Sequence, residues 1–366
     1  MSEAILIACV LFLVYLSQCF ASAPLDTVVF LLDDRGRGRL LRRWWQTGPS
    51  GRRVILLNPF LPHVSAVYTH RIPFVVRLDS NGRLQALEPL APDAPASAAA
   101  LSFEEPRDIT ACSKEVLVGD RKFAWFSTES SAREVAALLN RLQNAGPSDR
   151  VELLEKYFHQ KFAAQPIADQ LERFSRNTAF LETACFALFI FIFALGPAVI
   201  FRLGLARTWF PLLLYLIFAV ASILWAFARA YRRVYGREKG WPLQQLLAMA
   251  LSPFAAIRAS DLLAAELLEN SHPVAVARRL LPEEDFREFA GGELRKVRYL
   301  HGDAFLARVL EEFLARHAVD PEPLLRAPQR ESLSAQAYCP VCLTQYLIAG
   351  GVCRDCDGTQ LVAFPP

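Results

Sequence analysis

Two long apolar runs constrain the fold of this chain most strongly. They cover residues 183–201 and 208–228, and neither contains Asp, Glu, Lys or Arg. A helix needs about 20 apolar residues to cross about 30 Å of hydrocarbon, and each run is about that long. The link between them, residues 202–207, is too short for a domain. The runs therefore predict a transmembrane helical hairpin, 183–228. A buried helix pair in a soluble core is the alternative.

Composition and local chemistry agree with the hairpin. Hydrophobic residues make up 53% of the 366 residues, which is high for a wholly soluble protein. Trp209 and Trp225 lie near the two ends of the second run, where aromatic residues meet membrane interfaces. The Gly196-Pro197 pair predicts a kink near the end of the first helix of the hairpin.

A third apolar run lies at residues 4–23 and has two interpretations. Ala21-Ser22-Ala23 resembles a signal-peptide cleavage site. Against cleavage, the residues before the run hold an acid and no base, and Pro24 would follow the scissile bond. We favour an uncleaved N-terminal membrane anchor, 1–23, over a signal peptide.

Basic residues predict the orientation, because they accumulate on the cytoplasmic side of membrane segments. The hairpin link contains Arg202 and Arg207, whereas a larger basic group follows residue 228 and another follows the first run. The group after residue 228 comprises Arg229, Arg232, Arg233, Arg237 and Lys239, and the group after the first run comprises Arg35, Arg37, Arg39, Arg42 and Arg43. Three crossings satisfy both groups, with the N-terminus outside. The predicted location is an inner or cell membrane, with the soluble regions in the cytoplasm.

The rest of the chain divides by composition and periodicity into a multi-domain membrane protein. Between the anchor and the hairpin we expect a small α+β domain and a helical connection into the membrane. After the hairpin we expect an α-helical cytoplasmic region, a proline-containing linker and a C-terminal zinc ribbon. The expected boundaries are 24–145, 146–182, 229–317, 318–337 and 338–364.

Short patterns predict particular elements in these regions. Ser80-Asn81-Gly82 lies between two β-type runs and predicts a hairpin turn. The β-type runs 109–118 and 123–127 are expected to pair around Gly119-Asp120. Ser131 and Glu134 have capping-box spacing at the start of an amphipathic helix, and Ser260 is expected to cap another.

The strongest motif lies at the end of the chain, where four cysteines form two Cys-x-x-Cys pairs. They are Cys339, Cys342, Cys353 and Cys356. Two such pairs can close a tetrahedral Zn²⁺ site, which leaves no open position for a substrate and is therefore structural. Iron in a rubredoxin-like site and a pair of disulfides are the alternatives, and the predicted cytoplasmic location argues against disulfides. The remaining cysteines lie in apolar or mixed segments and are expected to pack as small hydrophobic residues.

The segment resembles short bacterial zinc ribbons that contain CPxC and CxDC motifs. The matching positions are Cys339, Pro340, Cys342, Tyr346, Gly350, Cys353, Asp355, Cys356 and Leu361. Leu343 replaces the glycine that usually follows the second ligand. The resemblance covers less than a tenth of the chain and implies a fold and a structural zinc ion, but no activity.

The charge of this module argues against a nucleic-acid partner. From residue 332 to the end, the charged side chains are Arg354, Asp355 and Asp357. Four thiolates around Zn²⁺ add a charge of about −2, so the module repels phosphate. Tyr346, Leu347 and Ile348 suit a protein contact, although they are equally suited to form the core of the ribbon itself.

Two functions remain open at this point. The first is a membrane-anchored adaptor or regulatory protein, whose cytoplasmic regions hold a protein partner at the lipid bilayer. The second is a membrane enzyme with an unidentified active site. The six histidines show no metal-ligand spacing and no phosphate-binding loop is complete, so no catalytic or cofactor-binding residue is nominated. This favours the adaptor, and the sequence predicts no oligomeric state.

Overall fold

A computed structural model describes residues 3–24, 27–32, 38–41, 44–47, 52–60, 62, 64–78, 84–87, 100–103, 107–126, 128–236, 240–356 and 358–364. The fold combines helices and small sheets, with long apolar helices and a C-terminal cysteine cluster. The chain forms two compact units, each built from two separate segments. Unit 1 comprises Met1–Thr69 and Ala164–Glu269, and unit 2 comprises His70–Ala163 and Asn270–Pro366. The range 24–145, expected as one domain, is thus divided between them.

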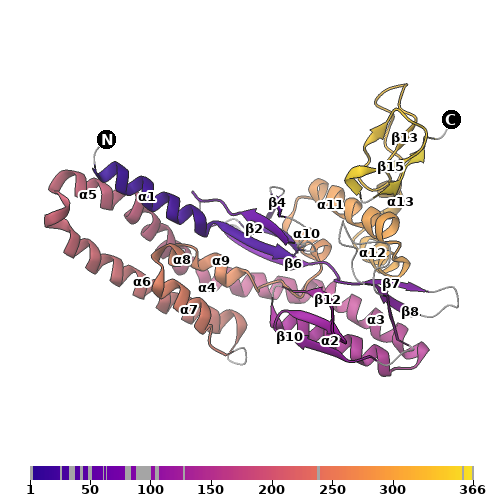
Figure 1. Cartoon of the computed structure of the whole chain (residues 1–366), viewed down its shortest axis with the longest axis horizontal. Coiled ribbons are helices and arrows are strands. Elements are labelled where there is room, and N and C mark those ends of the chain that lie inside the picture. The colour runs from indigo at the N-terminus through magenta and orange to yellow at the C-terminus, as the bar shows by residue number, and fades with distance from the viewer. Residues whose placement is uncertain are drawn as a thin grey trace. The chain divides into compact units, whose positions relative to one another are not determined.

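Unit 1 contains the apolar helices (Figure 1). They are α1 (Glu3–Gln18), α4 (Ala164–Ile190), the π-helix η1 (Phe191–Leu195), α5 (Gly196–Leu203), α6 (Leu205–Tyr235), α7 (Leu243–Leu251), α8 (Pro253–Ile257) and α9 (Ala259–Ala264). The helical segments Pro147–Leu203 and Leu205–Tyr235 are long and apolar enough to cross a membrane. They turn back on each other at Gly204, whose φ of 79° lies in the left-handed region that favours glycine.

The predicted irregularity at Gly196-Pro197 takes the form of a π-helical turn. Pro197 has no N–H to donate within the helix, and the Gly196 N–H bonds to the carbonyl of Phe191, five residues earlier. A Cβ added to Gly196 would lie 3.0 Å from that carbonyl oxygen. Glycine therefore lets the backbone widen where proline follows.

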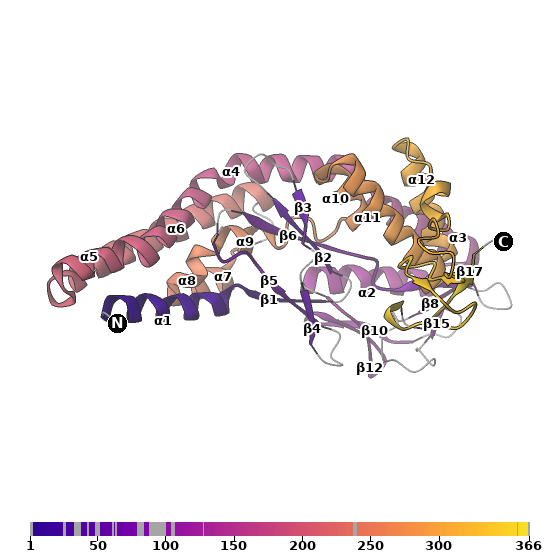
Figure 2. The ribbon, with the colours of Figure 1, turned by 90° about the horizontal axis from the view of Figure 1, so that it is seen from above.

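Helix α1 lies along the hairpin, with its N-terminal end near the hairpin tip (Figures 1 and 2). Phe12 packs edge-on against Phe193 at 5.6 Å, and an apolar groove of about 390 Å³ lies between α1 and the η1–α5 segment. The residues that line the groove include Ile5 of α1 and Phe201 near the hairpin tip. The expected anchor, 1–23, ends differently from the prediction, because residues 20–24 form a strand.

That strand belongs to one of two small sheets of unit 1. The first sheet has the order β1 (Phe20–Pro24), β5 (Arg52–Leu56) and β4 (Trp44–Thr47), and the second has β3 (Gly38–Leu40), β2 (Thr27–Leu32) and β6 (Ser65–His70). Ala23, at the candidate cleavage site, is buried and paired with Arg53 of β5. Cleavage there would remove most of β1 from its sheet.

A buried ion pair joins these sheets to the segment after α8. Arg258 and Asp261 are both buried and form a salt bridge. Arg258 also donates to the carbonyl of Asn58 at 2.9 Å, and Asp261 accepts the Ala66 N–H at 2.8 Å. Ser260, expected as a helix cap, instead donates to the carbonyl of Pro62. These bonds hold residues 58–66 within unit 1.

Unit 2 contains two further antiparallel sheets. They are β7 (Val75–Leu78), β8 (Leu84–Leu87) and β9 (Ala100–Ser102), then β10 (Ile109–Cys112), β11 (Glu115–Val118) and β12 (Arg121–Trp125). The predicted hairpin of β7 and β8 is present, and its turn residues 80–82 lie outside the described residues. The expected single strand 109–118 is instead a hairpin, because Ser113 adopts a φ of 55° and reverses the chain.

The helices of unit 2 are α2 (Glu129–Asn144), α3 (Pro147–Lys161), α10 (Pro273–Leu280), α11 (Glu283–Arg295), the π-helix η2 (Lys296–His301), α12 (Ala304–Arg316) and α13 (Pro321–Leu325). The cap predicted at Ser131 is wrong. Helix α2 begins three residues earlier, and Thr128 accepts the Ser131 N–H as its N-cap. Asp303 caps α12 and also accepts the Val76 N–H of β7, which ties the two segments of unit 2 together.

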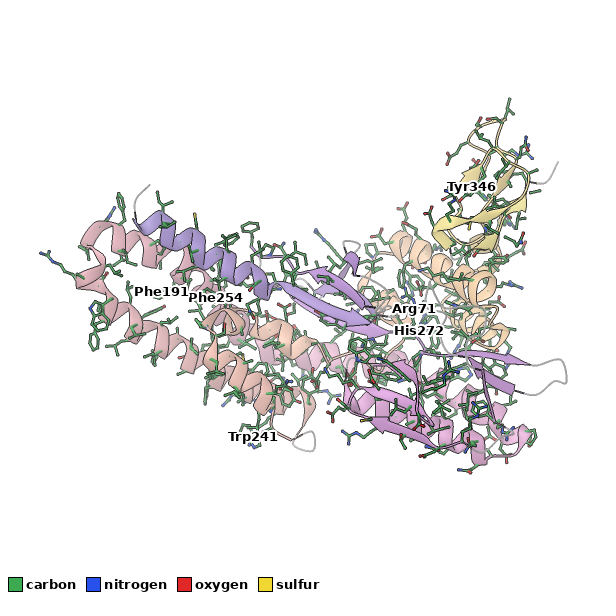
Figure 3. All side chains as sticks on the ribbon, viewed as in Figure 1. Arg71, Phe191, Trp241, Phe254, His272 and Tyr346 are labelled. Carbon is green, nitrogen blue, oxygen red and sulfur yellow. The ribbon has the colours of Figure 1, made fainter. Side chains whose placement is uncertain are left out.

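Charged groups and a histidine meet in the interior of unit 2 (Figure 3). Arg71 makes two contacts with the buried carboxylate of Glu293, and Lys296 makes a third at 3.0 Å. His272 is buried, stacks on Phe162 at 4.3 Å and accepts the Val274 N–H on Nδ1, which caps α10. This cap requires a neutral ring, because a protonated Nδ1 cannot accept a hydrogen bond.

We predict that His272 makes unit 2 acid-sensitive. Burial lowers its pKa from 6.5 to about 3; Glu293 opposes the shift, and Arg71 and Lys161 add to it. Burial likewise lowers the pKa of His70 to about 4, with Lys161 adding to that shift. Below pH 6.5 these histidines bind protons in the unfolded chain but not in the folded chain. As the pH is lowered below 6.5, the free energy of unfolding should decrease by up to about 1.4 kcal/mol per pH unit for each histidine. The decrease should end near pH 4 for His70 and near pH 3 for His272.

His272→Asn tests this prediction, because asparagine caps helices well and does not titrate. Hydrogen exchange of α10 amides, corrected for intrinsic rates, would be measured from pH 7 to pH 4 in both proteins. The variant should show a shallower loss of protection as the pH falls, whatever its stability at neutral pH. Equal slopes in the two proteins would contradict the assignment.

Candidate metal centre

The four C-terminal cysteines come together in one cluster, built on two short sheets. One sheet has the order β14 (Gln345–Tyr346), β13 (Ala337–Tyr338) and β17 (Val362–Ala363), and the other pairs β15 (Val352–Cys353) with β16 (Thr359–Gln360). Cys339 follows β13, Cys342 lies in the next turn, Cys353 ends β15, and Cys356 ends the 3₁₀ turn η3 (Arg354–Cys356). All four sulfur atoms lie within 4.8 Å of one another.

The first knuckle explains the departure at Leu343. The Cys339 N–H bonds to the carbonyl of Thr344 at 2.9 Å, and the Leu343 N–H bonds back to the carbonyl of Cys339 at 2.9 Å. This turn places Leu343 at a φ of 63°, in the left-handed region where glycine is unstrained. The leucine thus accepts the backbone conformation that the usual glycine provides.

The geometry and chemistry of the cluster fit a tetrahedral metal ion. Four thiolates at 2.3 Å from a tetrahedral centre lie about 3.8 Å apart. Cys342 Sγ and Cys353 Sγ lie 3.7 Å apart. Three of the four cysteines are buried, and only Cys342 is exposed. Burial raises the pKa of Cys356, and contacts with Cys342 add to that rise, so four crowded thiols favour a cation that can replace their protons.

Two polar side chains contact the sulfur atoms. The Tyr346 hydroxyl donates to Cys353 Sγ at 3.1 Å, and Thr344 Oγ1 lies 3.2 Å from Cys342 Sγ. Tyr346 lies in the C-terminal ribbon (Figure 3). A donor to a thiolate offsets part of its negative charge and fixes its direction toward the metal.

We predict that Tyr346→Phe weakens metal binding while leaving the fold intact. Groups that hydrogen-bond to metal ligands contribute about 10–100-fold to affinity. The loss would be measured by competition with a chromophoric chelator. Tyr338→Phe is the matched control, because it also removes a hydroxyl from the ribbon. The Tyr338 ring packs on Phe364 at 5.1 Å. Equal affinities for the two variants would show that the bond to Cys353 contributes little.

The ribbon packs against α11 and η2. Arg295, at the end of α11, donates from Nε to the carbonyl of Val341 at 3.2 Å and from Nη1 to the carbonyl of Leu324 at 2.7 Å. Leu300 of η2 packs on the buried core of the ribbon. The expected linker 318–337 contains α13, which packs on α11, so Arg295 bonds both to this segment and to the ribbon.

Arg295 is the residue of this site that the sequence did not reveal. It lies in an amphipathic helix far from the cysteines, in a stretch with other basic residues, and no motif marks it. The cysteine spacing, by contrast, pointed directly to the cluster. No family model matches the chain, and no curated protein or solved structure matches it.

Proposed function

We propose that this chain is a membrane-anchored adaptor that holds a protein partner at the cytoplasmic face of a cell membrane. In this proposal the C-terminal module is a structural zinc ribbon and presents the partner-binding surface. The observation that carries the proposal is the exposed tip of the ribbon, which is apolar and uncharged, on a chain with membrane-length apolar helices.

The tip lies between the two cysteine knuckles. Residues 343–352 contain no Asp, Glu, Lys, Arg or His. Leu347, Ile348 and Val352 are 69%, 57% and 51% exposed, so they do not form the core of the ribbon. An apolar group of this kind suits a protein contact, while the negative metal–thiolate centre disfavours nucleic acid.

Zinc is the metal that the donor set favours. Four thiolates in a closed tetrahedral arrangement are typical of structural zinc, and such a site leaves no position for a reacting molecule. When bound, the ion would hold the two knuckles together and supply most of the folding energy of this small module.

Apolar surface on the helices supports the membrane anchor. Large apolar side chains on α5 and α6 are exposed, and in water each would forgo about 1.5–3 kcal/mol of burial free energy. They include Phe201, Leu203, Trp209, Phe210, Leu213, Leu214, Ile217, Phe218 and Trp225. Because α1 runs beside the hairpin with its N-terminal end near the tip, it supports a third crossing with the N-terminus outside (Figure 1).

The basic flanks support the cytoplasmic orientation. Arg229, Arg232 and Arg233 lie at the end of α6 opposite the hairpin tip. Arg237, Lys239 and most of the basic group that follows the first run lie outside the described residues. Reporter fusions after residues 180 and 240 are expected to report a cytoplasmic location, and an external signal from either would contradict the topology.

Site-specific photo-crosslinking tests the adaptor function. A photoreactive amino acid at Leu347 should crosslink one defined protein in intact cells, and the same residue at Gln360 of β16 should not. Leu347→Asp should release that protein from the membrane fraction while the chain itself remains there. If the protein stays membrane-bound in the variant, the tip is not the adaptor surface.

A further inference from the structure

We infer that residues 241–257 form a re-entrant membrane segment, which enters the bilayer hydrocarbon beside α6 and returns to the same face. This inference rests on the proposed membrane anchoring and adds a lipid-contacting element that neither crosses the membrane nor lies in water. The exposed face of the segment would contact lipid hydrocarbon.

The segment has the surface of a lipid-facing helix. Residues 240–257 contain no Asp, Glu, Lys or Arg. Along α7, Leu243, Leu247 and Leu251 follow one another at intervals of four and therefore share one face. They are 71%, 61% and 78% exposed, so this face has no covering in unit 1. Gln245 lies on the inner side, within 3.5 Å of Glu266.

The turn between α7 and α8 makes several of its backbone hydrogen bonds within the segment, as a segment in hydrocarbon requires. The Ser252 N–H closes α7 on the carbonyl of Ala248. The Ser252 hydroxyl oxygen then accepts the Ala255 N–H as the N-cap of α8, and Pro253, which has no N–H to satisfy, opens that helix. Helix α7 is about 14 Å long, roughly half of the hydrocarbon thickness.

Contacts with the hairpin show how far the segment reaches. It starts at the cytoplasmic end of α6, where the guanidinium carbon of Arg232 lies 3.5 Å from the centroid of the Trp241 ring. Phe254 of α8 then packs on Phe193 at 6.3 Å, near the middle of the apolar run 183–201. Phe254 also packs on Tyr15 of α1 at 6.3 Å. The tip of the segment therefore lies at mid-depth of the apolar helices.

After α8 the chain returns to the last turns of α6, where the segment begins. Cys185, near the start of the apolar run, contacts the carbonyl of Ala256 at 3.4 Å. The Tyr235 hydroxyl, in the last turn of α6, donates to the carbonyl of Leu263 in α9. Trp241 and Leu263 thus both lie beside the last turns of α6, and the first charged residue after the segment, Arg258, is paired with Asp261.

Cysteine accessibility tests the inference in the full chain in native membranes. The parent protein would carry Cys9→Ser and Cys112→Ser, which remove the two exposed cysteines outside the ribbon. A water-soluble maleimide should label Ser148→Cys in unit 2 readily. Labelling of Leu247→Cys should be slower by about tenfold or more, because hydrocarbon excludes the reagent, and should become fast in denaturant.

Two further measurements separate the possible outcomes. Leu214→Cys, on the exposed face of α6, should be protected like Leu247→Cys. Protection of Leu214→Cys together with fast labelling of Leu247→Cys would overturn the re-entrant segment alone, whereas fast labelling of both would overturn the membrane anchor. Reporters after residue 240 and at the C-terminus should lie on the same side. Opposite sides would show a full crossing.

Discussion

Replacing Cys339 or Cys356 with serine is expected to release the metal and to unfold residues 338–364. Each change removes one of four sulfur atoms that lie within 4.8 Å of one another. Structural zinc contributes about 10–16 kcal/mol to the folding of small modules, and the ribbon strands are only two residues long. Three of the six residues in the buried core of the described ribbon are themselves cysteines of the cluster.

The effect should reach the surface of α11 but not the apolar helices α4 to α6. Arg295 and Leu300 contact the ribbon, so the end of α11 and η2 should lose protection from hydrogen exchange in the variants. In the proposed membrane, α4 to α6 should stay inserted, because insertion depends on apolar length.

Metal analysis of the purified full chain provides the measurement. About one zinc ion per chain is expected for the parent protein and for Cys112→Ser, a control that changes an exposed cysteine outside the cluster. A Cys356→Ser variant that keeps both its metal and a protease-resistant ribbon would contradict the assignment. So would a parent protein whose four cysteines are disulfide-bonded in the cell.

The sequence predicts features whose cause is local. The two long apolar runs, the four clustered cysteines and the hairpin strands β7 and β8 all follow from patterns within a few residues, and the structure shows each of them. The metal-ligand role of the cysteines stays a prediction until the metal is measured.

Features decided by distant contacts could not be predicted in this way. Composition groups residues 24–145 together, but Ala66 bonds to Asp261 while Val76 bonds to Asp303. In each case a backbone N–H donates to a buried aspartate side chain. These two hydrogen bonds hold β6 and β7 in different units. The cap predicted at Ser131 was wrong for a more local reason, because Ser131 has the right spacing to Glu134 but donates its N–H to Thr128, which is the N-cap.

The second large effect is expected from Glu293→Gln in the interior of unit 2. The Glu293 side chain is 4% exposed and contacts both Arg71 and Lys296. Burial alone would raise its pKa, but the charges of Arg71 and Lys296 hold the pKa well below its ordinary value of 4.5. The carboxylate is therefore charged in the folded protein, and glutamine would remove the negative charge that faces Arg71 and Lys296.

Removing one partner of a fully buried ion pair costs about 3–5 kcal/mol, and the cost here should be smaller because Arg71 is 21% exposed. Hydrogen exchange of α11 in the detergent-solubilised full chain would report this loss near neutral pH. Glu283→Gln is the matched control, since it removes a carboxylate from the same helix that pairs with Arg278 and Arg287 at the surface. Its effect should be much smaller, because water screens exposed ion pairs.

The pH dependence distinguishes the loss of a charge from a simple loss of packing. A carboxylate whose pKa is lowered by folding stabilises the protein fully above its ordinary pKa, and this stabilisation fades as the pH falls below about 4.5. The destabilisation by Glu293→Gln should therefore be largest near pH 7 and should shrink in acid. A packing defect would persist unchanged as the pH is lowered. A constant difference between the two proteins across this range would thus show that Glu293 acts by its shape and not by its charge.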